Sequence, residues 1–235
     1  MTVEEAIAAV FLKATGKTTT LTSGTKFNRI VGLLDFYQRR WSKESDIDWA
    51  SLYDPAFSIG TVTTTDTYDL DTSTVRKISQ RLGDPIRILW ADGEGYTDYD
   101  LVDADTLKDY YSGQNKENYS GYYCARIGNT LVFNHTFTED DQEYGGEITV
   151  PCYTYASAIS ADALNDDIQV DDPDWLVLIC AAEYVRNDIT RRSRYPEILR
   201  EANAAMERMK DDQDGQVQEV DRPWTPGMYN DSPWS

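Results

Sequence analysis

The feature that most constrains the fold is a marked helix start at Asp172, which is followed by two consecutive amphipathic patterns. The carboxylate of Asp172 can accept hydrogen bonds from the free amides of a first helical turn. Pro173 has no amide hydrogen, but at the first helical position that hydrogen would have no acceptor within the helix. Apolar residues then recur at helical spacing on one face: Trp175, Leu178, Ile179, Ala182, Val185 and Ile189. Pro196 predicts a break near residues 192–195, before a second face that comprises Tyr195, Ile198, Leu199, Ala202, Met206 and Met209. The pattern predicts a helical hairpin within residues 161–212.

The N-terminal region predicts two further helices. Thr2 and Glu5 have the spacing of a capping box, and the apolar residues that follow predict a short helix that ends near Gly16. A threonine-rich connector leads to a second helical pattern with Phe27, Ile30, Val31, Leu34, Tyr37 and Trp41. Residues 1–50 and 161–212 are therefore expected to form one small helical bundle.

The middle of the chain changes from a helical period to a period of two. Alternation and β-branched or aromatic residues indicate about six or seven short strands, which include 61–64, 67–70, 86–90 and 148–152. Residues 102–107 are typical of a single capped helical turn. The predicted fold class is α+β, with an antiparallel β domain over residues 55–160 inserted between the terminal helices.

Residues 213–235 are predicted to form an extended tail. The prolines in this segment prevent a helix from continuing and push the preceding residues toward extended conformations. The tail carries four large side chains of the types that dominate interface energetics, Trp224, Met228, Tyr229 and Trp234. We expect these four to bind a partner; the alternative is that the tail folds back onto its own core.

Charge and apolar patterning exclude several classes of protein. The formal net charge of −19 opposes a groove for nucleic acid, because such a groove needs clustered lysine and arginine. No run of about 18 apolar residues exists, and the N-terminus is acidic where a secretory signal would be basic, so neither a membrane span nor an export signal is expected. Three cysteines without paired spacing, Cys124, Cys152 and Cys180, and a single histidine predict reduced, mostly buried thiols and no structural zinc site.

Several segments partly resemble catalytic or ligand-binding motifs, but each lacks a residue that the motif requires. No catalytic, metal-ligating or cofactor-binding residue is therefore expected. Residues 14–18 end like a phosphate-binding loop, but Phe11 occupies the position of its first glycine. The acidic segment 165–174 lacks the spacing and central glycine of a calcium loop, which favours helix capping. His135 has no neighbouring nucleophile, and the many carboxylates lie mostly in polar runs without an apolar pocket.

The positive charges are segregated toward the two helical regions. Arg186, Arg191, Arg192 and Arg194 lie in the C-terminal helices, whereas acidic residues dominate between Asp92 and Asp174. Either these charges are solvated faces, or basic faces of one copy meet acidic surfaces of a neighbour. We predict that Trp175 and these four arginines contribute to an interface between copies.

The layout and several short phrases of residues 25–212 resemble the head-to-tail adaptor (connector) proteins of tailed bacteriophages. The phrases are Thr67–Asp71 followed by Val75–Ile78, Asp84–Ile88, Gly128–Phe133, Ile148–Tyr153, and the Asp172 helix start with its second helix. The acidity and the long aromatic tail depart from common members.

The resemblance implies a structural virion protein rather than an enzyme. It would assemble in the host cytoplasm as a ring of about twelve copies under the portal at the head–tail junction. The tail would dock into the portal, a downstream nozzle, tail-tube or fibre protein would bind below, and DNA would pass through the channel without specific binding. The alternatives are a carbohydrate- or cell-wall-binding or cleaving module, and another tail-completion structural protein.

Overall fold

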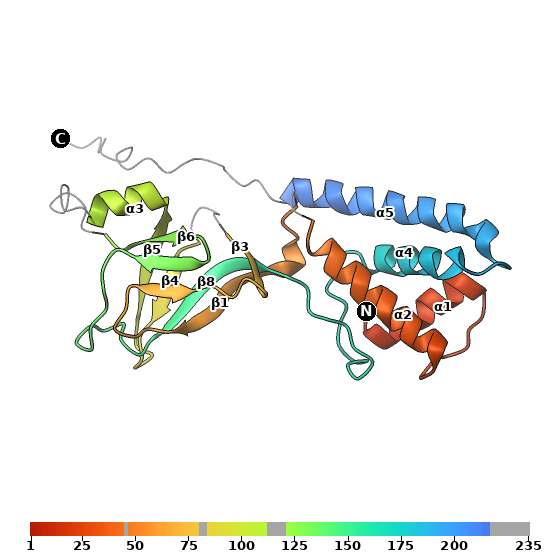
Figure 1. The fold of residues 1–235 in the computed structure, drawn as a ribbon, viewed down its shortest axis with the longest axis horizontal. Coiled ribbons are helices and arrows are strands. Elements are labelled where there is room, and N and C mark those ends of the chain that lie inside the picture. The colour runs from red at the N-terminus through yellow and green to blue at the C-terminus, as the bar shows by residue number, and fades with distance from the viewer. Residues whose placement is uncertain (45–46, 80–83, 112–120, 217–235) are drawn as a thin grey trace. The chain divides into compact units, whose positions relative to one another are not determined.

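The computed structural model describes residues 1–44, 47–79, 84–111 and 121–216 (Figure 1). The fold is α+β, with five α-helices and a curled, mostly antiparallel sheet in these ranges. The chain divides into two compact units, called here the helical unit (residues 1–53 and 153–216) and the β unit (residues 54–152). Each unit has its own hydrophobic core.

The N-terminal helices form as the sequence predicts. Helix α1 (Val3–Thr15) begins with the capping box: the Glu5 amide donates to Thr2 Oγ1 at 3.3 Å, and the Thr2 amide donates to Glu5 Oε2 at 2.9 Å. The helix ends at Gly16, whose φ of 73° is the left-handed conformation that glycine adopts without strain. Helix α2 (Thr25–Trp41) buries the face that contains Phe27, Ile30, Val31, Leu34 and Trp41.

Helix α4 (Pro173–Arg186) is the central helix of its unit. The Asp174 amide donates to the Asp172 carboxylate at 3.0 Å, which confirms the predicted cap. The expectation of a single apolar face is wrong, because α4 contacts α1, α2 and α5 and also buries Leu176, Cys180 and Ala181. A helix that is covered on most sides needs apolar residues on most sides. Ile189, which the sequence placed on this face, lies beyond the helix end and is 95% exposed.

Helix α5 (Tyr195–Gln216) follows the short 3-10 helix η2 (Arg192–Arg194), so the predicted break is confirmed. The predicted start of the tail at residue 213 is wrong, because α5 continues to Gln216. Gln213 explains the extension: its side chain accepts from the Ala50 amide at 3.2 Å and donates to the Asp171 carboxylate at 2.9 Å, which ties the last turns to the rest of the unit. Residues 217–235, with Trp224, Met228, Tyr229 and Trp234, lie outside the described residues.

The connector between the sheet and α4 completes the helical unit. Ala156 and Ile159, which fall inside the predicted β domain 55–160, pack in the core of the helical unit. The buried Gln38 fixes this connector: its Nε2 donates to the Ser157 carbonyl at 2.9 Å, and its Oε1 accepts from the Gln169 amide at 3.0 Å. The short 3-10 helix η1 (Ala50–Leu52) leads into the β unit.

The β unit contains an eight-stranded sheet in the order β1-β8-β4-β5-β6-β7-β2, with β3 paired to β8. The strands are β1 (Tyr53–Thr61), β2 (Thr67–Asp69), β3 (Val75–Ile78), β4 (Ile86–Leu89), β5 (Tyr96–Val102), β6 (Tyr123–Ile127), β7 (Thr130–Phe133) and β8 (Glu147–Thr154). Antiparallel pairing joins β2 with β7, β4 with β5 and β8, and β6 with β7. The predicted strand over residues 61–64 is wrong, because β1 ends at Thr61 and residues 62–64 form no strand.

One pair of strands departs from the predicted antiparallel sheet. Strands β5 and β6 are parallel, with Leu101 opposite Cys124. A parallel pair needs a crossover connection, and helix α3 (Ala104–Tyr111) lies in this connection (Figure 1). Asp103 caps α3 by accepting from the Thr106 amide at 2.8 Å. The predicted single turn over 102–107 is therefore the start of a longer helix.

All three cysteines are free and buried, as predicted. Burial raises the pKa of the Cys124, Cys152 and Cys180 thiols above their ordinary value, and Asp54 adds to the rise at Cys152. None of the helices in the described ranges is long and apolar enough to cross a membrane.

Candidate functional site

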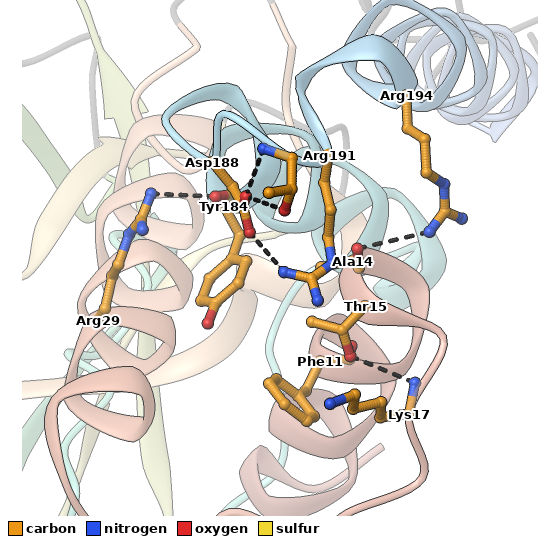
Figure 2. A network of polar contacts seen from close by, with 10 residues as sticks. Phe11, Ala14, Thr15, Lys17, Arg29, Tyr184, Asp188, Arg191 and Arg194 are labelled. Atoms are coloured by element: carbon orange, nitrogen blue, oxygen red, sulfur yellow. Dashed lines mark hydrogen bonds and ion pairs between the residues drawn. The ribbon is translucent and has the colours of Figure 1, made fainter.

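The residues predicted at an interface occupy two different environments. Trp175 lies in the core of the helical unit and is only 6% exposed, so it has little surface to offer a neighbour. The four arginines lie together at the end of the unit where α4 finishes and α5 begins: Arg186, Arg191, Arg192 and Arg194. We call this region the basic end; it also includes Lys17, which follows α1, and Arg29 of α2 (Figure 2). Lys26, also on α2, lines the same groove as Arg29.

The segment between α4 and η2 is held in shape by Asp188 (Figure 2). One oxygen of its carboxylate accepts from the Thr190 amide at 2.9 Å and the Thr190 hydroxyl at 2.6 Å, and the other accepts from Arg191. The Thr190 hydroxyl and the Arg191 guanidinium together lower the pKa of Asp188 to about 2. The Asp188 carbonyl also accepts from the Arg192 amide at 2.8 Å. The segment is therefore an ordered loop with its carboxylate ionised.

Arg29 connects α2 to the last turn of α4. Its Nη2 donates to the carbonyl oxygens of Tyr184 at 3.1 Å and Glu183 at 3.3 Å, and its guanidinium lies 4.7 Å from the Tyr184 ring centroid. Carbonyls in a last helical turn lack intrahelical donors, so a cation there satisfies them and the helix dipole together. The sequence did not single out Arg29. Lys26 and Arg29 are three positions apart, and this spacing places both side chains on one face of a helix.

The end of α1 is joined to the same region. Arg194 donates to the Ala14 carbonyl at 3.4 Å. The Thr15 hydroxyl donates to the Phe11 carbonyl at 2.7 Å and accepts from the Lys17 amide at 3.2 Å, which closes the helix (Figure 2). Three helices thus deliver positive charge to one end of the helical unit.

Among the described residues, the most exposed large apolar side chain lies among these charges. Ile189 is 95% exposed, on the ordered loop that follows α4. A groove of about 480 Å³ runs beside it, lined by Thr25, Lys26, Arg29, Tyr184, Asn187, Asp188 and Ile189. The groove is open and combines cations with an apolar side chain, which suits a macromolecular surface rather than a small enclosed ligand.

A second groove of the helical unit, beside the start of α4, is mainly acidic. A groove of about 600 Å³, called here the acidic groove, is lined by Ala50, Asp171, Asp172, Arg208, Met209, Asp211, Asp212 and Gln213. Asp171 is fixed by the Gln213 amide and by the Ser51 backbone amide, which donates at 3.1 Å. In the described part of the chain, Asp211 and Asp212 accept no hydrogen bond and form no ion pair. The acidic groove therefore presents mainly negative charge, opposite in sign to the basic end.

In the part of the β unit that the structure describes, Glu143 is a buried carboxylate. Glu143 is 8% exposed and accepts from the Thr97 hydroxyl at 2.7 Å, and the same hydroxyl accepts from Trp90 Nε1 at 3.0 Å. His135 stacks on Tyr99 with ring centroids 6.0 Å apart. These contacts organise the interior of the unit. Among the described residues, no three His, Cys, Asp or Glu side chains gather closely enough to hold a metal ion.

Comparisons with protein-family models and with curated proteins found no match for this chain. What the basic end can do therefore follows from its own chemistry. Fixed cations around an exposed isoleucine attract an acidic surface that also offers apolar area.

Proposed function

We propose that this chain is a structural virion protein of the head-to-tail adaptor class. In this proposal about twelve copies form a ring under the portal, join it to the tail and line the channel through which DNA leaves. The helices from both chain ends act as one bundle, the inserted β unit reaches the tail-side partner, and the C-terminal tail binds the portal.

The observation that carries the proposal is the pair of separately packed units. Residues 1–53 and 153–216 pack around one hydrophobic core and residues 54–152 around another. A ring component between two other assemblies needs distinct surfaces for each, and two units with independent cores supply them. The charge supports the same proposal, because a chain of net charge −19 repels phosphates and lets DNA slide past.

The chemistry of the grooves favours binding over catalysis. The acidic groove and the groove beside Ile189 are lined mainly by charged and polar side chains. The buried carboxylate of Glu143 is held by a threonine hydroxyl inside the β unit, which is a structural position. A sugar-cleaving module would instead present two close carboxylates in a cleft.

The deciding experiment measures assembly with a portal protein encoded by the same genome. Mass photometry of the purified chain, with and without the portal, should show a complex whose mass corresponds to a closed ring of the chain on the portal. A variant that ends at Gln216 keeps every described residue, so it should stay folded by circular dichroism and lose portal binding. Portal binding equal to that of the full chain would contradict the role of Trp224 and Trp234, and no complex with either chain would reject the adaptor function.

A further inference from the structure

We propose that copies of this chain associate head to tail through the helical unit, with the Ile189 loop of one copy seated in the acidic groove of the next. The contact deepens the proposed function, on which it rests, by naming the surfaces that join neighbours in the ring. It is nevertheless measurable on the purified chain alone.

The Ile189 loop has the properties of an interface anchor. Its isoleucine is 95% exposed, and burial of such a side chain is favourable wherever a complementary pocket exists. The loop is already ordered by Asp188, which holds Thr190 and Arg191. A preorganised anchor loses less conformational entropy on binding, so more of the burial energy appears as affinity.

The charges around Ile189 specify an acidic partner. Lys26 and Arg192 are exposed and form no side-chain hydrogen bond or ion pair within the described residues. Helix α2 adds to this positive charge, because its first turn contains no acid and Gly24 provides no side-chain cap. The N-terminus of a helix carries a partial positive charge, so Lys26 lies where a cation is unfavourable until an anion approaches.

The acidic groove offers the complementary chemistry. Asp211 and Asp212 are exposed on its rim without partners in the described chain, and they supply the negative charge. Exposed Ala50 supplies apolar surface for an isoleucine, above the buried Met209 that closes the floor of the groove. Arg208 also lines the groove and can approach the Asp188 loop, whose carboxylate is ionised. The wall at Asp171 is fixed by Gln213, so this surface is also ordered.

The two surfaces lie at opposite ends of α4 and cannot meet within one copy. Asp172 precedes the first turn of α4 and Asn187 follows its last, and 14 helical residues span about 20 Å. A contact between different surfaces of identical copies is heterologous, and such contacts generate closed rings or open filaments. An assembly built this way leaves no unpaired end when the ring closes.

A second copy fits the basic end better than DNA does. A phosphate backbone would pair with Lys26 and Arg29 but would leave Ile189 in water. The remainder of the chain carries a large negative charge, which repels a polyanion at long range. The acidic groove uses both the charge and the apolar side chain.

The first test is cross-linking between copies. Carbodiimide joins a lysine amine to a carboxylate that it contacts, and mixing ¹⁵N-labelled with unlabelled chain distinguishes links between copies from links within one. We expect mixed-label peptides that join Lys26 to Asp211 or Asp212. Their absence at low salt, in samples where links within copies form, would overturn the contact.

The second test uses complementary variants. Ile189→Asp disables the loop, and the double variant Asp211→Lys with Asp212→Lys disables the groove. Arg200→Glu, at an exposed position of α5, is the charge control. We expect each disabling change to weaken self-association by about tenfold or more in sedimentation velocity at low salt, with little effect of the control. Circular dichroism verifies that each variant is folded.

Mixing the two disabled variants gives a sharper result. The loop variant keeps an intact groove and the groove variant keeps an intact loop. At a concentration where each variant alone is monomeric, the mixture should therefore form one-to-one dimers. An isologous interface, in which both partners use the same surface, would form no such dimer. Monomers only in the mixture would overturn the proposal.

The outcomes separate the contact from the proposed function. Normal rings of the loop variant on the portal would leave the adaptor function standing and reject this contact. Cross-links and mixed dimers without any portal complex would support the contact and reject the adaptor function. DNA binding that requires Ile189 and Lys26, without cross-links between copies, would show that the basic end has another partner.

Discussion

The guanidinium of Arg29 stacks over the ring of Tyr184, with 4.7 Å between its central carbon and the ring centroid, and donates to the Tyr184 carbonyl at 3.1 Å. One side chain of α2 thereby covers both the aromatic ring and the open carbonyls at the end of α4. The contact joins residues that are 155 positions apart in the sequence, and it orders the basic end from which Ile189 projects.

Arg29→Ala should destabilise the protein by about 1–2 kcal/mol, because it removes a cation–π contact and the hydrogen bonds to two helix-end carbonyls. The free energy of unfolding from urea denaturation, followed by far-ultraviolet circular dichroism, measures the loss. Arg192→Ala is the matched control, since this exposed arginine lacks a side-chain partner in the described chain and should change stability by less than about 0.5 kcal/mol. Equal losses for the two variants would contradict the structural role of Arg29.

Gln38→Met should cost about 2–4 kcal/mol although it keeps nearly the same volume. Gln38 is 2% exposed and bonds the Ser157 carbonyl and the Gln169 amide, so methionine removes the partner of both part-buried backbone groups. Urea denaturation measures the change in the free energy of unfolding, and Asn203→Ala, at an exposed position of α5, is the control. A loss below about 0.5 kcal/mol would mean that water replaces both bonds.

The parts of the fold that depend on neighbours in sequence were predictable. The Thr2–Glu5 capping box, the Asp172 cap and the break before Tyr195 are set by residues within one helical turn, so their patterns are local. The apolar face of α5 also followed from spacing, since Ile198, Ala202 and Met209 are buried.

The parts that depend on distant residues were not predictable. Nothing near α4 in sequence indicates that three helices surround it, and the length of α5 depends on bonds from Gln213 to Ala50 and Asp171. The parallel pairing of β5 with β6 requires knowledge of where the chain returns after α3. Of the predicted interface residues, the structure gathers the four arginines at one end but buries Trp175, because an apolar helical spacing cannot distinguish core from interface.

The Asp188 loop should keep its hydrogen bonds until the pH falls to about 2. The folded pKa is lowered to about 2 from an ordinary value of 3.8, so the stabilisation is present above the ordinary value and is lost as the pH falls through the folded one. A ¹³C carboxyl titration by NMR measures the Asp188 midpoint directly. Thr190→Ala removes the hydroxyl, the first contributor to the shift, and should move the midpoint upward. A midpoint near 4 in the unchanged protein would show that the loop contacts are absent in solution.

Thr97→Val should destabilise the β unit by about 2 kcal/mol. The Thr97 hydroxyl donates to the buried Glu143 carboxylate and accepts from Trp90, and valine keeps the shape while leaving both groups unpaired. Thr149→Val is the matched comparison, because its hydroxyl donates to one neutral carbonyl, that of Arg87, at 3.1 Å. Urea denaturation should show a loss for Thr149→Val of about 1 kcal/mol. A larger loss for Thr149→Val than for Thr97→Val would contradict this ordering.

The three cysteines should react with a thiol reagent only when the protein unfolds. Cys124, Cys152 and Cys180 are each 0% exposed, and burial raises the pKa of the Cys152 thiol to about 12, so the native protein near pH 8 holds almost no accessible thiolate. Labelling with a disulfide reagent should therefore be slow in buffer, accelerate with urea and reach three thiols per chain after denaturation. Asn203→Cys, at an exposed position of α5, is the control and should add one rapidly reacting thiol. Rapid labelling of any native cysteine without urea would mean that its part of the core opens far more readily than its packing implies.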